Sequence, residues 1–184
     1  NKDKGGCNPS NYYIPDFGYY YTIPELDFEW IGLEESANDC PGGEAFTDCG
    51  SQSKGCGYLA KMKAASEDMM KERAKNSTNH NFMIIQHYGG SGEKYINDFK
   101  QRRGNTSGDV IWAAGGHSHV QECVHYDNHG ICEAILTGGG GHGAANSRKG
   151  FMVIGFDENK KMIQPLSINS TEISCFSPCG ENIT

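Results

Sequence analysis

The stretch FMIIQHYGGSGEKYINDFKQRRGNTSGDVIWAAGGHSH, residues 82–119, decides the fold class of this 184-residue chain. Its apolar runs at 82–86 and 109–114 predict two buried strands, because strands covered on both faces read as continuous hydrophobic runs. Residues 93–103 between the two runs predict a helix that ends at Gly104. The stretch therefore predicts a parallel strand–helix–strand unit.

Further elements extend this unit in both directions. Apolar residues at helical spacing predict an amphipathic helix from Tyr58 to about Lys75, after a long polar loop over 34–57. Before the loop, alternating patterns predict strands at 19–23 and 28–33. After the unit, strands are predicted at 120–126, 131–136, 150–157 and 161–168, and we expect them to form an antiparallel meander. This order predicts an α/β sandwich rather than a barrel.

The charge and hydropathy of the chain argue against two classes of partner. The formal net charge is -7, and no cluster of Lys and Arg stands out. We therefore expect no nucleic-acid partner, because binding a phosphate backbone needs a basic face. No run of about 18 apolar residues occurs, so the sequence predicts no membrane span.

Cysteines and glycosylation sequons point to the secretory pathway. The eight cysteines include no C-x-x-C pair, which favours disulfides over a zinc site. We predict the pair Cys123–Cys132, because the segments around them read as adjacent hairpin strands. The N-x-[ST] sites are Asn76, Asn105, Asn169 and Asn182. We expect a secreted or lumenal protein, and since no signal peptide is seen at the start of the sequence, we expect a segment upstream of it.

Three histidines are candidate metal ligands at the ends of the two buried strands. His87 follows FMIIQ, and His117 and His119 follow DVIWAAGG. Ligands of α/β sheets bind at the carboxyl ends of strands, and imidazole is a good ligand for zinc, iron and similar ions. The two glycines before His117 allow a tight turn and a close backbone approach. The H-x-H spacing predicts rings directed at two neighbouring ions.

These motifs resemble the calcineurin-like metallophosphoesterases, and most closely the purple acid phosphatases. The last two metal-binding motifs of that family are an apolar strand ending in His, which IIQH at 84–87 resembles, and a strand ending in Gly-His-x-His, which GHSH at 116–119 resembles. The segments IPDFGYYYTIPELDFEWIGLEE, 14–35, and ICEAILTGGGGH, 131–142, are similar to flanking parts of the phosphatases. The likeness covers roughly residues 12–165 and is most specific over 82–143.

The resemblance implies a fold, a site and a reaction. The fold would be a metallophosphoesterase-type β-sandwich flanked by helices, of which this chain supplies a partial domain. We interpret residues 58–168 as the C-terminal half of that domain, 1–57 as its Cys-, Gly- and Tyr-rich N-terminal part, and 169–184 as a Cys-containing tail. His87 and His117 would bind one ion and His119 the other, the pair being iron with zinc or manganese, or similar. The substrate would be a phosphate ester.

The sequence departs from the family where its earlier motifs should supply Asp and Asn ligands, because no such motif occurs here. Three imidazoles do not hold two ions alone, so we expect an upstream segment or a second chain to complete the site. The chain would then be the distal half of a secreted phosphoric ester hydrolase. Two alternatives are an inactive secreted glycoprotein subunit of an extracellular assembly and a disulfide-rich binding module unrelated to phosphatases.

Three further residues are candidates for the edge of the site. His142 lies in a run of glycines that suggests close backbone approach to the substrate, against a plain glycine-rich turn. Tyr88 would lie at the mouth of the pocket or serve packing alone. Glu122 would accept a hydrogen bond from a metal-binding histidine, His119, and so orient its ring.

Overall fold

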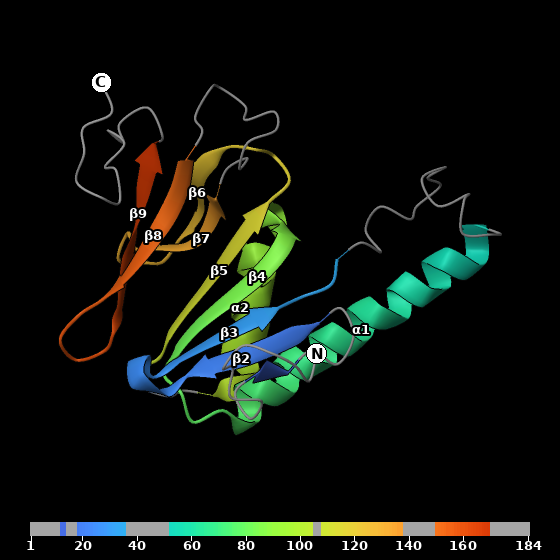
Figure 1. The fold of residues 1–184 in the computed structure, drawn as a ribbon, viewed down its shortest axis with the longest axis horizontal. Helices are drawn as coiled ribbons and strands as arrows, with labels where there is room; N and C mark the ends of the chain where they lie inside the picture. The colour runs from blue at the N-terminus through green and yellow to red at the C-terminus, as the bar shows by residue number, and fades with distance from the viewer. Residues whose placement is uncertain (1–11, 14–17, 36–51, 105–107, 138–149, 170–184) are drawn as a thin grey trace, which may run out of the picture.

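The computed structural model of the chain describes residues 12–13, 18–35, 52–104, 108–137 and 150–169. These residues form an α/β fold with one mixed sheet, two packed helices and a small two-stranded sheet (Figure 1). The strands are β1 (Tyr12–Tyr13), β2 (Tyr19–Ile23), β3 (Phe28–Gly32), β4 (Asn81–Tyr88), β5 (Val110–Gly116), β6 (Gln121–Tyr126), β7 (Cys132–Thr137), β8 (Gly150–Phe156) and β9 (Met162–Asn169). The helices are α1 (Gln52–Asn76) and α2 (Gly92–Arg103), and the 3-10 turns are η1 (Pro24–Leu26) and η4 (Gly89–Ser91).

The main sheet has the strand order β1-β2-β3-β4-β5-β7-β6. The four strands β3, β4, β5 and β7 are parallel neighbours, while β2 and β6 run antiparallel to the strands that they pair with. The predicted parallel strand–helix–strand unit is confirmed as β4–α2–β5. The carboxyl ends of the parallel strands therefore meet at one edge of the sheet, which is where α/β proteins place their ligands.

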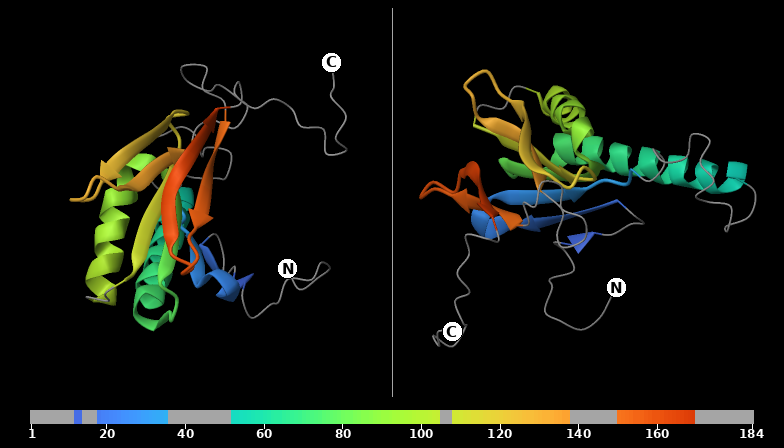
Figure 2. Two further views of the ribbon diagram at one scale, coloured as in Figure 1. Left: turned by 90° about the vertical axis from the view of Figure 1, so that its left-hand side faces the viewer. Right: turned by 90° about the horizontal axis from the view of Figure 1, so that it is seen from above.

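The two helices cover one face of the main sheet (Figure 2). From the sheet, Ile31, Phe82 and Ile84 contribute to this core, and all three side chains are fully buried. The helices contribute apolar side chains that are adjacent or about one turn apart, which are Met69, Met70 and Ala74 from α1 and Tyr95, Ile96 and Phe99 from α2. Removal of this apolar surface from water is the main driving force for the layer.

The hairpin β8–β9 covers part of the opposite face (Figures 1 and 2). Alternate residues of β4 point to this side, so Met83 packs with Trp112 while its neighbours Phe82 and Ile84 face the helices. The hairpin contributes Met152, Ile154, Phe156 and Met162 to this second core. The continuous apolar run in β4 is explained by burial on both faces.

Two sequence-based predictions about the helices and strands are wrong. The helix predicted from Tyr58 begins at Gln52, so Cys56 lies in α1 and not in a loop. Gly55 and Gly57 suggested a loop, but each glycine raises the free energy of a helix by only about 1 kcal/mol. A longer helix tolerates that cost.

The predicted single meander of four strands is also wrong. β6 and β7 form the expected antiparallel hairpin, but β7 joins the main sheet beside β5, with which it is parallel. β8 and β9 form a separate sheet. The pattern predicts each hairpin but does not say which sheet it joins. The predicted disulfide Cys123–Cys132 is confirmed and links β6 to β7.

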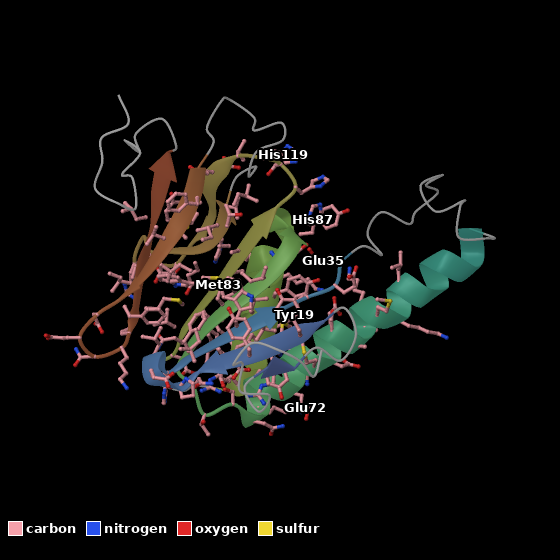
Figure 3. The ribbon with its side chains drawn as sticks, viewed as in Figure 1. Tyr19, Glu35, Glu72, Met83, His87 and His119 are labelled. Carbon is pink, nitrogen blue, oxygen red and sulfur yellow. A yellow bond between two sulfur atoms is a disulfide. The ribbon has the colours of Figure 1, made fainter. Side chains whose placement is uncertain are left out.

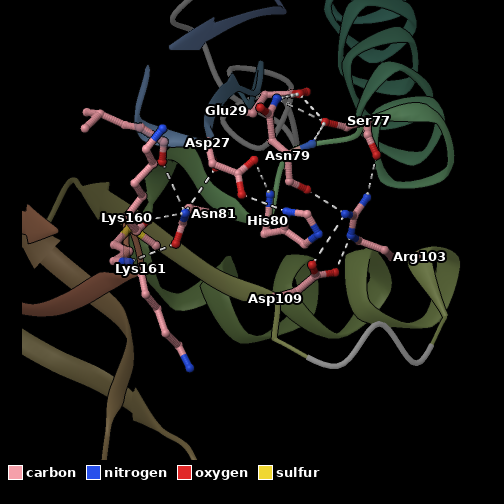
Figure 4. Close-up of polar contacts among 12 residues, drawn as sticks. Asp27, Glu29, Ser77, Asn79, His80, Asn81, Arg103, Asp109, Lys160 and Lys161 are labelled. Atoms are coloured by element: carbon pink, nitrogen blue, oxygen red, sulfur yellow. Dashed lines mark hydrogen bonds and ion pairs between the residues drawn. The ribbon is translucent and has the colours of Figure 1, made fainter. Parts of the chain in front are cut away.

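A polar network holds the amino ends of the parallel strands together (Figure 4). Arg103 forms an ion pair with Asp109 and donates hydrogen bonds to the carbonyl oxygens of Ala74, Ser77 and Asn79. The Asn81 side chain donates to the carbonyl oxygens of Leu26, Asp27 and Lys160 and accepts from the Met162 N–H at 2.8 Å. Asn81 thus joins the main sheet to the hairpin β8–β9.

Candidate metal centre

The candidate site lies at the carboxyl ends of the neighbouring parallel strands β4 and β5. His87 is the second-to-last residue of β4, and His117 directly follows β5. The regular pairing of the two strands shifts between Ile85 and Tyr88, where a bulge or irregularity interrupts the register. Bulges of this kind redirect side chains next to functional sites. The His87 side chain lies at this edge of the sheet (Figure 3).

The imidazoles of His87 and His117 lie in direct contact. The Nε2 atom of His87 is 3.2 Å from the Nδ1 atom of His117, and the ring centroids are 5.1 Å apart at an interplanar angle of 77°. Both residues are exposed to solvent. One nitrogen must carry a proton for this contact to be a hydrogen bond, and which one does depends on the tautomers. The sequence-based expectation that these two histidines converge agrees with this geometry.

The Tyr88 ring packs against both imidazoles. Its centroid is 4.8 Å from that of His87 and 4.7 Å from that of His117. An aromatic side chain in this place restricts the rotamers open to both histidines. The position agrees with either a place at the edge of the site or a packing role, and contact with a substrate stays a prediction.

Close backbone approach brings the two strand ends together. A Cβ atom placed on Gly115, in β5, would lie 2.6 Å from the Cα of Gly89 and 2.9 Å from its nitrogen. Real side chains do not tolerate such distances from backbone atoms, so only glycine fits at residue 115 without a shift. The glycine pair sets how near the β4–α2 connection comes to β5.

The backbone of the histidine loop is in a costly conformation. His117 has a φ angle of 65° and His119 a φ angle of 58°, both in the left-handed region. Residues other than glycine adopt this region uncommonly, histidine more often than most, and each instance costs on the order of 1–3 kcal/mol. Such strain at two residues of one short loop is typical of functional sites.

His119 is exposed and lies in the loop between β5 and β6, at the same end of the sheet as His87 (Figure 3). Within the described part of the chain, no group of three or more His, Cys, Asp or Glu side chains is close enough to hold a metal ion. The structure therefore brings together His87 and His117, and a shared site that includes His119 stays a prediction.

A largely apolar cavity of about 550 Å³ lies beside His87, between the main sheet and β8. Trp30, Met83 and Ile85 line it from the sheet, and Phe151 and Ile154 line it from the hairpin. Cavities of this size with few polar groups are common ligand sites. The cavity therefore places an apolar wall next to the imidazole of His87.

Sequence reasoning missed Glu35 as a residue of this region. Glu35 follows β3 and is only 2% exposed. Its Oε2 accepts a hydrogen bond from the Tyr88 N–H at 2.8 Å, and its Oε1 accepts one from the Tyr95 hydroxyl at 3.1 Å. One signal in the sequence could have indicated it: Glu35 follows β3, which is parallel to β4, so it lies at the same edge of the sheet as His87.

The remaining predicted residues lie away from this contact or outside the described residues. Glu122 is exposed on β6, and its role as a hydrogen-bond acceptor for His119 stays a prediction. Asn76 is exposed at the end of α1, as a glycosylation site requires, and Asn169 is the last residue of β9. His142, Asn105 and Asn182 lie outside the described residues.

Of the helices in the described ranges, neither is long and apolar enough to cross a bilayer. No protein-family model, curated protein or solved structure matches this chain.

Proposed function

We propose that this chain is part of a secreted phosphoric ester hydrolase with a dinuclear metal centre, similar to the purple acid phosphatases among the calcineurin-like metallophosphoesterases. The observation that carries the proposal is the contact between His87 and His117, whose facing nitrogens are 3.2 Å apart at the ends of two parallel strands. In this proposal, His87 and His117 hold one ion, and His119 holds the second.

The distance between the two nitrogens fits a shared ion. Two imidazole nitrogens, each about 2.0–2.1 Å from one zinc ion, are about 2.8–3.4 Å apart, the lower values at an octahedral ion and the higher at a tetrahedral one. The measured separation of 3.2 Å falls inside this range. The rings are exposed, so exchange of a proton for an ion needs no opening of the core. Imidazole also suits the iron, zinc or manganese that we expect in the site.

The strained loop supports the same reading. Glycine adopts positive φ at the lowest cost, and asparagine, aspartate and histidine adopt it more often than other residues do. Here the residues with φ angles of 65° and 58° are the two histidines, His117 and His119. The conformation sets the directions of their rings at the expense of local stability.

Bound ions would supply Lewis-acid charge that polarises a phosphate ester and stabilises the transferring phosphoryl group. The chain itself supplies the nitrogen ligands, the Tyr88 ring that restricts them, and an adjoining apolar wall. In the described residues the nearby buried carboxylate of Glu35 is already engaged by the Tyr88 N–H and the Tyr95 hydroxyl. We expect the oxygen ligands to come from an upstream segment or a second chain.

The test uses the native protein as isolated from its source. We expect bound transition metal by elemental analysis and hydrolysis of 4-nitrophenyl phosphate. The changes His87→Ala and His117→Ala should each remove metal and lower the rate by about 100-fold or more, as loss of a ligand in a metal hydrolase does. His129→Ala is the matched control, since His129 is exposed in the turn between β6 and β7.

The outcomes separate the hydrolase from the glycoprotein alternative. Absence of both metal and turnover in the native protein would contradict the proposal and favour a non-enzymatic secreted subunit. Full metal content after the change at His87 or His117 would contradict the ligand assignment even if the protein hydrolyses phosphate esters.

A further inference from the structure

We propose that Glu35 is a positioning residue, which fixes the end of β4 so that the Tyr88 ring holds the imidazoles of His87 and His117 in contact. The inference concerns the geometry of the histidine pair. It rests on the proposed function only for its effect on metal affinity.

The main-chain contact between β3 and β4 changes just before the histidine. The Leu33 N–H donates to the Ile85 carbonyl at 2.8 Å, which continues the parallel pairing past the end of β3. The register of β4 with β5 then shifts between Ile85 and Tyr88. Beyond this point the Tyr88 N–H is bonded by a side chain, the Oε2 of Glu35, at 2.8 Å. Glu35, which follows β3, thus holds β4 to the β3 side of the sheet at Tyr88, one residue beyond His87.

The second carboxylate oxygen of Glu35 is fixed by α2. The Tyr95 hydroxyl donates to Oε1 at 3.1 Å, and Tyr95 is 1% exposed. Burial of the phenol, together with the nearby carboxylates of Glu35 and Glu67, raises the pKa of Tyr95, so its hydroxyl remains a donor. Glu35 therefore has one oxygen on the helix layer and the other on the strand end.

A second buried glutamate shows what a purely structural carboxylate looks like in this fold. Glu29 has no exposed surface, and Arg73 donates to both of its oxygens at 2.6 and 2.9 Å. Among the ion pairs of the described residues, none includes Glu35. A buried carboxylate without a cation is costly. The contacts that Glu35 makes are to the Tyr88 N–H and the Tyr95 hydroxyl, and the first of these groups belongs to the residue that packs on both histidines.

The hydrogen bond from the Tyr88 N–H to Glu35 affects the histidines through the Tyr88 ring. The backbone nitrogen that Glu35 fixes belongs to Tyr88, whose ring centroid is 4.8 Å from His87 and 4.7 Å from His117. Without the carboxylate, the Tyr88 backbone loses this anchor. The ring then no longer holds both imidazoles, and their nitrogens separate from 3.2 Å.

The experiment compares Glu35→Ala, Glu35→Asp and Glu35→Gln in the full chain, with Glu67→Ala as the matched control. Glu67 also lies at the Tyr95 hydroxyl, at 3.3 Å, but is not bonded to Tyr88 in the described contacts. Three quantities are measured by NMR and titration: the nuclear Overhauser contact between the Tyr88 and His117 rings, the exchange rate of the Tyr88 amide hydrogen, and the affinity for zinc.

We expect Glu35→Ala to lose the ring contact, to raise the amide exchange rate at least about tenfold and to weaken zinc binding about 10–100-fold, the usual effect of removing a residue that orients a metal ligand. Glu35→Gln retains an oxygen acceptor and should restore most of all three values. Glu35→Asp keeps the charge but withdraws the oxygens, so it should show the losses even if the alanine variant does not fold. Glu67→Ala should match the wild type.

Two results would overturn the proposal. One is an unchanged ring contact and Tyr88 amide exchange in Glu35→Ala or Glu35→Asp. The other is an equal loss in Glu67→Ala, which would show that the effect passes through Tyr95 alone. Failure of the proposed function has a different signature, since the wild type would not bind zinc while the ring contact and the amide exchange still report on Glu35.

Discussion

The two ends of the parallel sheet are built in opposite ways. At the amino ends, Arg103, Asn81 and Glu29 are each bonded to several partners, and these side chains are mostly buried (Figure 4). At the carboxyl ends, His87 and His117 are exposed, and the loop after β5 has left-handed backbone at two histidines. The amino ends hold polar groups with hydrogen-bond partners, and the carboxyl ends expose imidazole nitrogens beside strained backbone.

This difference indicates a division between stability and function. Satisfied buried polar networks rigidify a fold, whereas functional sites commonly retain features that lower stability. Changes at the amino ends should therefore lower the free energy of unfolding without altering the histidine pair. Changes at the carboxyl ends should alter the histidine pair and leave the free energy of unfolding nearly constant. The predictions below test this division, beginning with the largest expected effect.

Glu29→Ala should lower the free energy of unfolding by about 3 kcal/mol, because it leaves the Arg73 guanidinium without its buried partner. The change also removes the acceptor of the Ser77 hydroxyl and the Asn79 amide. Urea unfolding measures the effect, with the exposed Glu72→Ala on the same helix α1 as control. A loss below about 1 kcal/mol would contradict the structural importance given to this end.

Arg103→Lys should cost about 2 kcal/mol although the positive charge is retained. The guanidinium serves Asp109 and three carbonyl oxygens at once, and a lysine ammonium does not match that geometry. The comparison is with Arg102→Lys, an exposed neighbour on α2. Equal unfolding midpoints for the two variants would mean that charge, and not the arrangement of donors, holds this end together.

Gly115→Ala tests the other end of the sheet. The added methyl group would lie 2.6 Å from the Cα of Gly89 and must push the β4–α2 connection away from β5. We expect zinc affinity to fall about tenfold, since small shifts of metal ligands have effects of this size. Gly90→Ala is the matched control, because an added Cβ atom on Gly90, in the same β4–α2 connection, would meet no atom within 4 Å. An unchanged zinc affinity would show that the two strand ends tolerate separation.

His119→Gly should weaken metal binding without lowering stability. Glycine adopts the φ angle of 58° at little cost, so the free energy of unfolding should stay constant or rise by up to about 1 kcal/mol. Thermal unfolding and zinc titration of the same sample check both parts. A stability loss larger than about 1 kcal/mol would show that this histidine serves the fold.

Asp127→Asn should have the smallest effect. Backbone hydrogen bonds, first from the Ile131 N–H and then from the His129 N–H, lower the pKa of Asp127 below its ordinary value of 3.8. Because the folded pKa is the lower one, the carboxylate stabilises the protein above about pH 4 and loses this effect as the pH falls through the folded pKa. The difference in unfolding midpoint between wild type and variant should therefore shrink on acidification. A difference that is constant down to about pH 2 would contradict this account.

Local sequence pattern predicts the framework of the fold well, because its central strands are buried on both faces. The runs FMIIQ and DVIWAA leave little choice but parallel strands, and His87 and His117 then lie at neighbouring strand ends. The pattern does not predict that β8–β9 forms a separate sheet against the main one. The residues that join the two sheets are 79 and 81 positions apart, as in the bonds of Asn81 to Lys160 and Met162.

The buried Glu35 escaped prediction for the same reason. Its partners Tyr88 and Tyr95 are 53 and 60 positions along the chain. A glutamate in a polar segment after a strand ordinarily faces solvent. Only the tertiary arrangement of β3, β4 and α2 shows that this carboxylate is enclosed.

The close contact between Gly89 and Gly115 has a consequence for movement. Gly89 opens the turn η4 that leads into α2, and it also lies against the Leu136 side chain of β7. Three strand ends therefore bear on one residue at the start of the helix. A displacement of α2 along its axis would therefore press, through η4, on the end of β5 next to His117.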